Sequence, residues 1–462
     1  MEWLLFFDLS ELAYLTPLGQ QWWVFMHGGW VIVLLIGLPL WWVERLRRKR
    51  ISYLAGIKYV LLAIDVPKET EQSPKAVESI FTALAGSFMK PNKYKRYILG
   101  EIEKPFSFEI VSLGGYIQFF IRTPEDFRDL VEAAVYAQYP DAEIVESEDY
   151  VDRVSSNFDT DEYDLWGTEF ILENKDIYPI RTYVDFEHQA SEDFKDPMAA
   201  TLEILSRIKP DEDVWLQLLV TPIDDSWQAM GIAEVKKLTE GQKTKKAGVF
   251  QNFGSGLSET LRVMGDSLVS YSKEENEKKQ EMVVPTIIRL TPGQRNIVEA
   301  IERKISKIGF KTKFRMIYWG RRETFLKGRG VNAVVGAIKQ YTALNLNGFK
   351  PSSLVTTKAD YFLVHQRITK KQKKILRAYK LRSPFRGAGH GRILNTEELA
   401  TLYHFPVMTV KAPLIKKTDM KKAEPPFALP VFRNGARQPI ETGSNKEPIA
   451  GQAPPANLPF IE

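Results

Sequence analysis

The sequence predicts an α+β protein with an N-terminal transmembrane helix, two ferredoxin-like (βαββαβ) repeats, a small α/β C-terminal region and a disordered tail. Three observations lead to this fold class. Residues 22–43 carry no formal charge, two sets of elements recur in the order β-α-β-β-α-β, and residues 424–462 are rich in Pro, Gly, Asn and Gln.

The uncharged stretch at 22–43 reads WWVFMHGGWVIVLLIGLPLWWV. At about 1.5 Å per residue, a helix of this length matches the roughly 30 Å hydrocarbon core of a bilayer. Tryptophan pairs stand at both ends, and a basic run follows immediately. We therefore expect a single-pass protein of the cytoplasmic (inner or plasma) membrane, with residues 1–21 as an interfacial segment outside and the bulk of the chain in the cytoplasm. A buried helix of a soluble protein is the alternative.

The first repeat is expected at residues 52–150. Its helices should begin at capping residues followed by proline, and its strands should be apolar or alternating. The expected elements are a strand at 59–66, a helix from Ser73-Pro74, two strands around Gly114-Gly115, a helix from Thr123-Pro124 and a strand near 142–145.

The second repeat is expected at 165–320, after an acidic linker at 146–164. The same order of elements and the same X-Pro helix starts indicate an internal duplication, although X-Pro starts are common in all proteins. The expected elements are a strand at 180–186, a helix from Asp196-Pro197, a strand at 214–221, an insertion at 222–282, a strand at 283–290, a helix from Thr291-Pro292 and a strand at 314–318.

Residues 321–423 form the expected C-terminal α/β region, with a helix at 331–341 and a strand at 361–364. Its most basic segment, 365–386, is expected to be helical. The basic residues either form a solvated face or contact phosphates of nucleic acid or anionic lipid. Because they are expected to point around the helix, binding should be weak and without sequence preference. The candidate polyanion-binding residues are Lys370, Lys371, Lys373, Lys374, Arg377 and Lys380.

Composition and motifs offer little catalytic chemistry. The formal charge is +5, most of it from the basic run after residue 43, and the chain has no cysteine. Disulfides, Cys-based metal sites and thiol nucleophiles are therefore excluded. No phosphate-binding G-x-x-x-x-G-K-[ST] string, H-E-x-x-H or G-x-S-x-G occurs, and the five histidines lack metal-ligand spacing. We expect no enzyme activity, cofactor or metal, with a cryptic enzyme as an alternative.

The most distinctive string is ILNTEELATLYHFP at 393–406. Asn395 and Glu398 have the spacing of a capping box, and an aromatic cluster precedes Pro406. A proline-rich PPFALP stretch follows at 425–430, in a form suited to short docking segments. The candidate partner-docking residues are Leu399, Tyr403, His404, Phe405, Pro425 and Pro426.

These strings, together with segments at 106–144 and 196–227, resemble the membrane-proximal N-terminal region of type IV secretion and conjugation-type ATPases of the HerA/FtsK superfamily, from uncultured bacterial lineages. The resemblance covers most of 55–430. In such proteins a Pro-Pro-Leu-Pro stretch leads into the ATPase domain, whereas here a tail follows. The resemblance implies a non-enzymatic membrane scaffold or ATPase-docking component of a DNA or protein transfer apparatus. Implied partners are the lipid bilayer, a separate P-loop ATPase and further copies of the chain. The alternative is a membrane-tethered protein with weak nucleic-acid contact.

Overall fold

The structure is a computed structural model. The described residues are 16–24, 26, 30–67, 72–155, 158, 161–187, 196–240 and 290–406. The expected strand at 283–290, except its last residue, lies outside these residues. So do the insertion lysines Lys243, Lys245 and Lys246 and the tail at 424–462.

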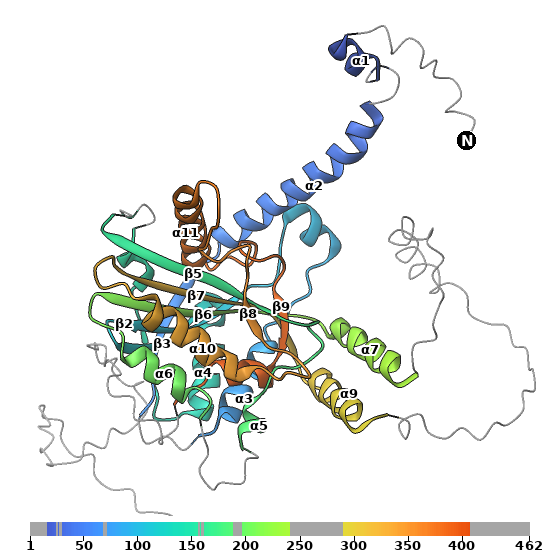
Figure 1. The fold of residues 1–462 in the computed structure, drawn as a ribbon. Coiled ribbons are helices and arrows are strands. Elements are labelled where there is room, and N and C mark those ends of the chain that lie inside the picture. The colour runs from blue at the N-terminus through green and yellow to red at the C-terminus, as the bar shows by residue number, and fades with distance from the viewer. Residues whose placement is uncertain are drawn as a thin grey trace, which may run out of the picture. The chain divides into compact units, whose positions relative to one another are not determined.

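Nine strands of the described chain form one antiparallel sheet, which confirms the α+β class (Figure 1). Eight of them follow the order β4-β1-β3-β2-β6-β7-β5-β8, and β9 pairs with β7. The strands are β1 (Tyr59–Asp65), β2 (Phe106–Leu113), β3 (Tyr116–Pro124), β4 (Glu143–Glu146), β5 (Tyr163–Leu172), β6 (Glu212–Pro222), β7 (Gly309–Arg321), β8 (Phe349–Pro351) and β9 (Arg392–Asn395).

Each half of the sheet has the strand order of a ferredoxin-like unit, 4-1-3-2, and the halves meet where β2 pairs with β6. In the first half the helices between the strands are α3 (Pro74–Ala85) and α4 (Arg128–Gln138). Ser73 caps α3 as expected, with Pro74 at its start. In the second half the corresponding helices are α6 (Ala199–Ser206) and α10 (Ala333–Ile338).

The first and last strands of the second half differ from the expectation. The first strand is β5, which begins inside the predicted acidic linker, and the last is the three-residue β8. Residues 180–186 are not a strand but contain the short helix α5 (Tyr183–Glu187). The physical reason is that backbone N–H groups of this segment bond to side chains of α12 (Thr396–Leu402) and not to a neighbouring strand. The backbone N–H groups of Ile180 and Tyr183 donate to side-chain oxygens of Glu398 and Thr401 at 2.9 Å.

Between β6 and β7, where the first half has a tight turn, the described residues contain two helices instead. They are α7 (Gln228–Glu240) and α9 (Pro292–Ile305), which pack on each other. The expected capping box of α9 is confirmed, because Thr291 and Gln294 bond reciprocally.

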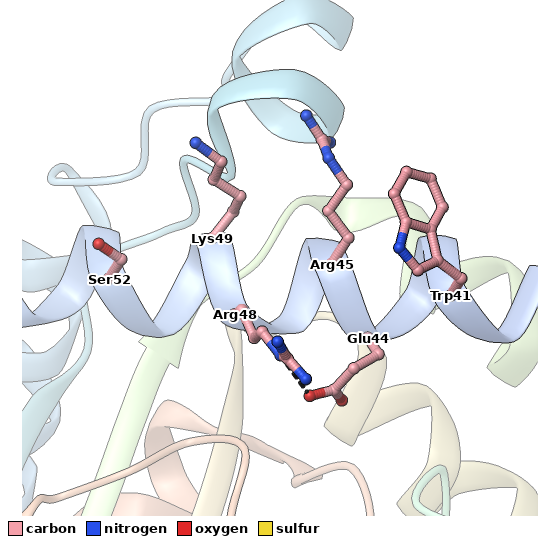
Figure 2. Close-up of a pocket in the computed structure, with 6 residues that line it drawn as sticks. All are labelled: Trp41, Glu44, Arg45, Arg48, Lys49 and Ser52. Carbon is pink, nitrogen blue, oxygen red and sulfur yellow. Dashed lines mark hydrogen bonds and ion pairs between the residues drawn. The ribbon is translucent and has the colours of Figure 1, made fainter.

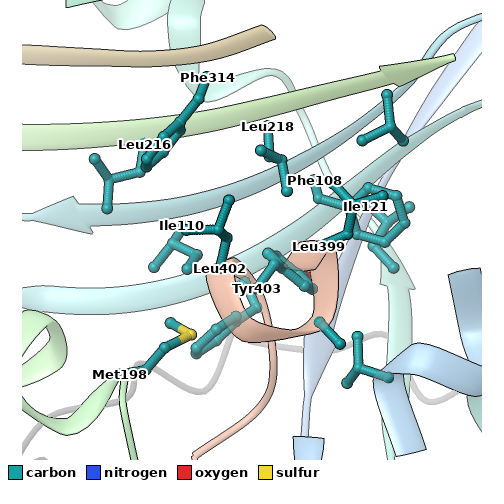
Figure 3. Packing of buried hydrophobic residues seen from close by; sticks show 14 of the residues in the cluster. Phe108, Ile110, Ile121, Met198, Leu216, Leu218, Phe314, Leu399, Leu402 and Tyr403 are labelled. Atoms are coloured by element: carbon teal, nitrogen blue, oxygen red, sulfur yellow. The ribbon is translucent and has the colours of Figure 1, made fainter. Parts of the chain in front are cut away.

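Two layers cover the two faces of the sheet. On one face, α3, α4, α6, α10 and α12 build the larger core, which joins both halves. Figure 3 shows α12 set against β2 and β3, and the ring of Tyr403 lies 5.0 Å from that of Phe108. The other face is covered by the 3₁₀ turn η6 (Tyr150–Arg153) and by α11 (Val364–Lys380), which pack on Trp215 and Ile317.

The predicted transmembrane helix is wrong. Within the described residues, no helix has both the length and the apolar character that crossing a bilayer requires. The uncharged stretch is divided between α1 (Pro17–Val24) and α2 (Trp30–Ala55), and in α2 it ends at Val43, before Glu44 and Arg45. At about 1.5 Å per residue, that part of α2 is roughly 20 Å long, short of the roughly 30 Å needed. The predicted location, a single-pass membrane protein with its N-terminus outside, is wrong for the same reason.

Because one core spans both repeats, we predict that they unfold together. Replacing Phe108 of the first repeat by Ala should lower the free energy of unfolding by about 3–5 kcal/mol through the cavity it leaves. Residues 52–150 contain no tryptophan, whereas the second repeat buries Trp166 and Trp215. Urea unfolding followed by tryptophan fluorescence should therefore shift to lower midpoint. An unchanged fluorescence midpoint, with an early transition by circular dichroism, would show independent repeats.

Candidate functional site

Helix α11 has one buried side and one exposed side. Its inner side carries Gln372, Ile375, Leu376 and Tyr379, which are buried at helical spacing. Ile375 and Tyr379 pack on the sheet, and the Gln372 side-chain amide donates to the Leu165 carbonyl at 2.9 Å.

The outer side of α11 is a single cationic stripe. Lys370, Lys373, Lys374 and Arg377 are exposed and stand at positions i, i+3, i+4 and i+7, so they share one helix face. In the part of the chain that the structure describes, none of the four forms an ion pair. The expectation that the charges point around the helix is therefore corrected. The apolar and amide side chains occupy the inner face, and the cations are left together on the outer one.

The other two predicted polyanion-binding residues have structural contacts. The Lys371 ammonium donates to the carbonyls of Ser353, Thr356 and Lys358 at 3.2, 3.0 and 2.8 Å, which holds the preceding turn against the helix. Lys380 is largely buried and lies 4.0 Å from a carboxylate oxygen of Asp152.

An exposed aromatic loop leads into α11. Tyr361 is 95% exposed and Phe362 77%, although a strand was expected at 361–364. Tyr361 and Leu363 have positive φ angles of 69° and 50°, in the left-handed region that side chains with a Cβ rarely adopt. The Arg367 guanidinium donates to the carbonyls of Asp360 and Phe362 at 3.0 and 3.4 Å. The loop is thus held in one conformation that directs both rings to solvent.

Beneath α11 runs a row of buried polar residues on four neighbouring strands. Glu109 pairs in register with Gln217, Gln217 with Arg315, and Arg315 with Glu169. Their side chains are bonded in the same order. The Gln217 amide donates to Glu109 at 3.0 Å, and Arg315 donates to Gln217 and Glu169, both at 3.1 Å. We call these four residues, with Arg382, the polar row.

Arg382 joins the end of α11 to the polar row. The N–H groups of Arg382 and Ser383 donate to the carbonyls of Tyr379 and Ala378, the pattern of a Schellman motif. Glycine usually takes the left-handed position of this motif, but here Arg382 has a φ of 42°. Its guanidinium donates twice to Glu109, at 2.9 and 3.0 Å, and also to Asp149. The strained backbone therefore places a cation where the row needs one.

These contacts set the charge of Glu109. Burial by itself would raise the pKa of this carboxyl, but the Arg382 cation and hydrogen bonds from Arg382, Ser107 and Tyr150 outweigh it and lower the pKa to about 2. Burial raises the pKa of Tyr150 well above its ordinary value, so its hydroxyl stays protonated and donates to Glu109 at 2.7 Å.

The glycine-rich segment at 387–391 closes the other end of the row. Lys313 donates to Glu169 at 2.9 Å and to the carbonyls of Arg386 and Gly389. Gly387 has a φ of +112° and lies so close to the Glu169 carboxylate that a Cβ would overlap it. Gly387 therefore packs on a buried ion pair.

The predicted partner-docking residues are core residues where they are described. Leu399, Tyr403, His404 and Phe405 are 2% exposed or less. His404 joins Asp196 through its Nε2 at 2.8 Å, and neither side chain reaches solvent. Pro425 and Pro426 lie outside the described residues.

A second surface feature lies on α2. A hollow of about 440 Å³ is lined by Trp41, Glu44, Arg45, Arg48, Lys49 and Ser52. In Figure 2, Trp41, Arg45 and Lys49 extend to one side of the helix, and Arg48 meets Glu44 on the other at 2.9 Å. Because one helix supplies the whole lining, this is an open groove. Among the described residues, no cluster of three His, Cys, Asp or Glu is suited to a metal ion.

The fold and site define a class: two fused ferredoxin-like repeats that carry a cationic surface helix with an exposed aromatic loop. Residues 67–418 match the model of a family described as a domain of unknown function (DUF8128), and the chain belongs to that family. No curated protein matches the chain. The family description states no activity, and nothing in it indicates secretion or conjugation, so those two predicted descriptions are withdrawn.

Sequence reasoning missed the aromatic loop and Arg382. The sequence predicts a strand at 361–364, and aromatic and apolar residues are common in strands. Asp360, which breaks the apolar run, and the preceding Ser/Thr/Lys-rich turn were the available signals against it. Nothing local marks Arg382, since its partner Glu109 lies far away in the sequence.

Breaking the Arg382–Glu109 pair should be costly. We predict that Arg382→Ala lowers the free energy of unfolding by about 3–5 kcal/mol, because it leaves Glu109 charged and buried. Arg207→Ala, which removes an exposed i,i+4 pair with Glu203, is the control and should cost less than about 1 kcal/mol. The double variant Glu109→Met/Arg382→Met should be more stable than Arg382→Ala in urea unfolding. Equal stabilities of the double variant and Arg382→Ala would contradict the conclusion that Glu109 is left charged and buried in Arg382→Ala.

The same pair predicts a pH dependence. The pKa of Glu109 falls from an ordinary 4.5 in the unfolded chain to about 2 in the fold. Its contribution is therefore complete above about pH 4.5 and is lost as the pH falls toward 2. Wild type should lose roughly 3 kcal/mol more than Glu109→Gln over that window, measured by urea unfolding at several pH values. Parallel pH profiles of the two proteins would refute this origin.

Proposed function

We propose that this protein is a non-catalytic nucleic-acid-binding protein that uses the outer face of α11. The observation that carries the proposal is the stripe of four exposed, unpaired cations at Lys370, Lys373, Lys374 and Arg377. Such a face attracts a phosphate backbone and releases counterions on binding. The stripe is about 10 Å long, enough for contact with two or three phosphates of one strand.

The support for α11 beneath the stripe favours this function. Arg382 fixes the end of the helix to the sheet and Lys371 fixes the helix to the turn before it, so the outer cations have a rigid base. A rigid base lowers the ordering cost of binding. The contacts of these four cations with phosphates are electrostatic and carry no information about base identity. Binding is therefore sequence-independent and sensitive to salt.

The test is a titration of a labelled oligonucleotide with the full chain. We predict that the variant Lys370→Gln/Lys373→Gln/Lys374→Gln/Arg377→Gln binds at least about tenfold more weakly at 50 mM salt. The affinity of the wild type should itself fall steeply, by a factor of a few tens, between about 50 and 200 mM salt. The control variant changes four exposed lysines elsewhere on the surface, Lys209→Gln/Lys237→Gln/Lys327→Gln/Lys339→Gln. It should bind the oligonucleotide nearly as tightly as wild type does. Equal weakening by both variants would mean that net charge, not the stripe, governs binding.

A second candidate function is a scaffold that docks another protein along α2. Large apolar side chains there are exposed, among them Leu35 and Leu40, which favours a partner surface. The resemblance of the sequence to ATPase-associated regions makes a separate P-loop ATPase the partner to test first. Co-purification of such an ATPase that is lost on Leu35→Ser/Leu40→Ser would support this function.

A further inference from the structure

We propose that the site on α11 prefers single-stranded nucleic acid, because Tyr361 and Phe362 form a platform on which unpaired bases stack. The inference rests on the proposed function and adds the substrate class. Its geometry is the placement of two exposed rings, next to each other in the chain, at the start of the helix that bears the cationic stripe.

The exposure of these rings is built into the fold. A Tyr and a Phe that are 95% and 77% exposed leave apolar surface in water, which costs free energy in the unbound protein. The loop could hide such rings by relaxing its backbone. Instead, Tyr361 and Leu363 occupy the left-handed region, and Arg367 bonds the carbonyls on both sides of Tyr361. Strain that neighbouring contacts maintain is typical of a binding site.

The turn before the loop is also fixed. The N–H of Ser352 donates to the Glu169 carbonyl, and that of Thr357 donates to the Gly167 carbonyl, so the turn is attached to β5. Lys371 then joins the turn to α11 through three carbonyls. The platform is therefore rigid on both sides, and stacking a base on it orders little of the protein.

The chemistry favours single strands over duplexes. Rings stack on the faces of bases, which are free in a single strand and covered by neighbours in a duplex. The adjoining cations hold the phosphates that follow the stacked bases. An aliphatic surface would serve a protein partner or a lipid equally well. Here two adjacent exposed side chains are aromatic and directly precede the helix that carries the unpaired cations, the combination that single-strand-binding sites use.

The experiment compares a labelled oligothymidylate with a duplex of equal length, each of about 20 nucleotides per strand, titrated with the full chain at low salt. Tyr361→Ala/Phe362→Ala should weaken single-strand binding by roughly 10- to 100-fold and change duplex binding by less than about twofold. Leu354→Ala is the matched control. Leu354 is 80% exposed in the adjoining turn but aliphatic, and its loss should leave both affinities unchanged. Ultraviolet cross-linking with mass spectrometry should place the thymidylate on Tyr361 or Phe362.

Each other outcome overturns the inference. Equal losses on single strand and duplex would make the rings a general contact, and no loss would remove them from the site. Binding to phosphatidylglycerol vesicles that is lost in both Tyr361→Ala/Phe362→Ala and Leu354→Ala, without an effect on the oligothymidylate, would assign the loop to lipid. Failure of the proposed function is distinguishable, since the stripe variant would then bind the oligothymidylate as wild type does.

Discussion

The structure depends on the ion pair between Glu109 and Arg382 and on the polar row it begins. Glu109 lies on β2, at the centre of the sheet, where a charged carboxylate would be prohibitive without compensation. Arg382 supplies that compensation from the end of α11, and Gln217 and Arg315 carry the hydrogen bonding on to Glu169. One face of the sheet is thus closed by polar groups that are mutually satisfied, and a substitution at one end leaves a charge without a partner.

The polar row also crosses the junction of the two repeats. Glu109 and Gln217 face each other across the β2–β6 pair, the seam between the halves. The opposite face of the same seam is apolar, with Phe108 and Leu218 paired there. The two faces therefore specify the junction differently. The apolar face contributes burial, and the polar face fixes register, since a shift of one residue would leave several charges unpaired.

The surface function follows from this interior. Gln372, Ile375 and Tyr379 face the sheet that carries the polar row. The four cations of the stripe lie on the opposite side of the helix and are therefore exposed to solvent. Arg367 holds the aromatic loop before the helix and Lys371 holds the turn before that loop, and both use backbone carbonyls as partners. A buried network thus orients a helix, and the helix presents its four exposed cations along one face.

The sequence by itself determined what is local. The caps at Ser73, Thr291 and Asn395 were predicted correctly, because a capping side chain bonds a backbone group within three residues. The apolar strands of the first repeat were also clear. Tertiary structure alone decided the rest. It made β5 a strand despite its acidic start. It also paired the backbone of residues 180–186 with side chains of α12, so that this segment is not a strand. It began α2 at Trp30, which leaves too short an apolar part of that helix for a membrane span. The direction of the cations on α11 is also a tertiary property. It depends on which side of the helix meets Glu109 and Gln217, which lie more than 150 residues before α11 in the sequence.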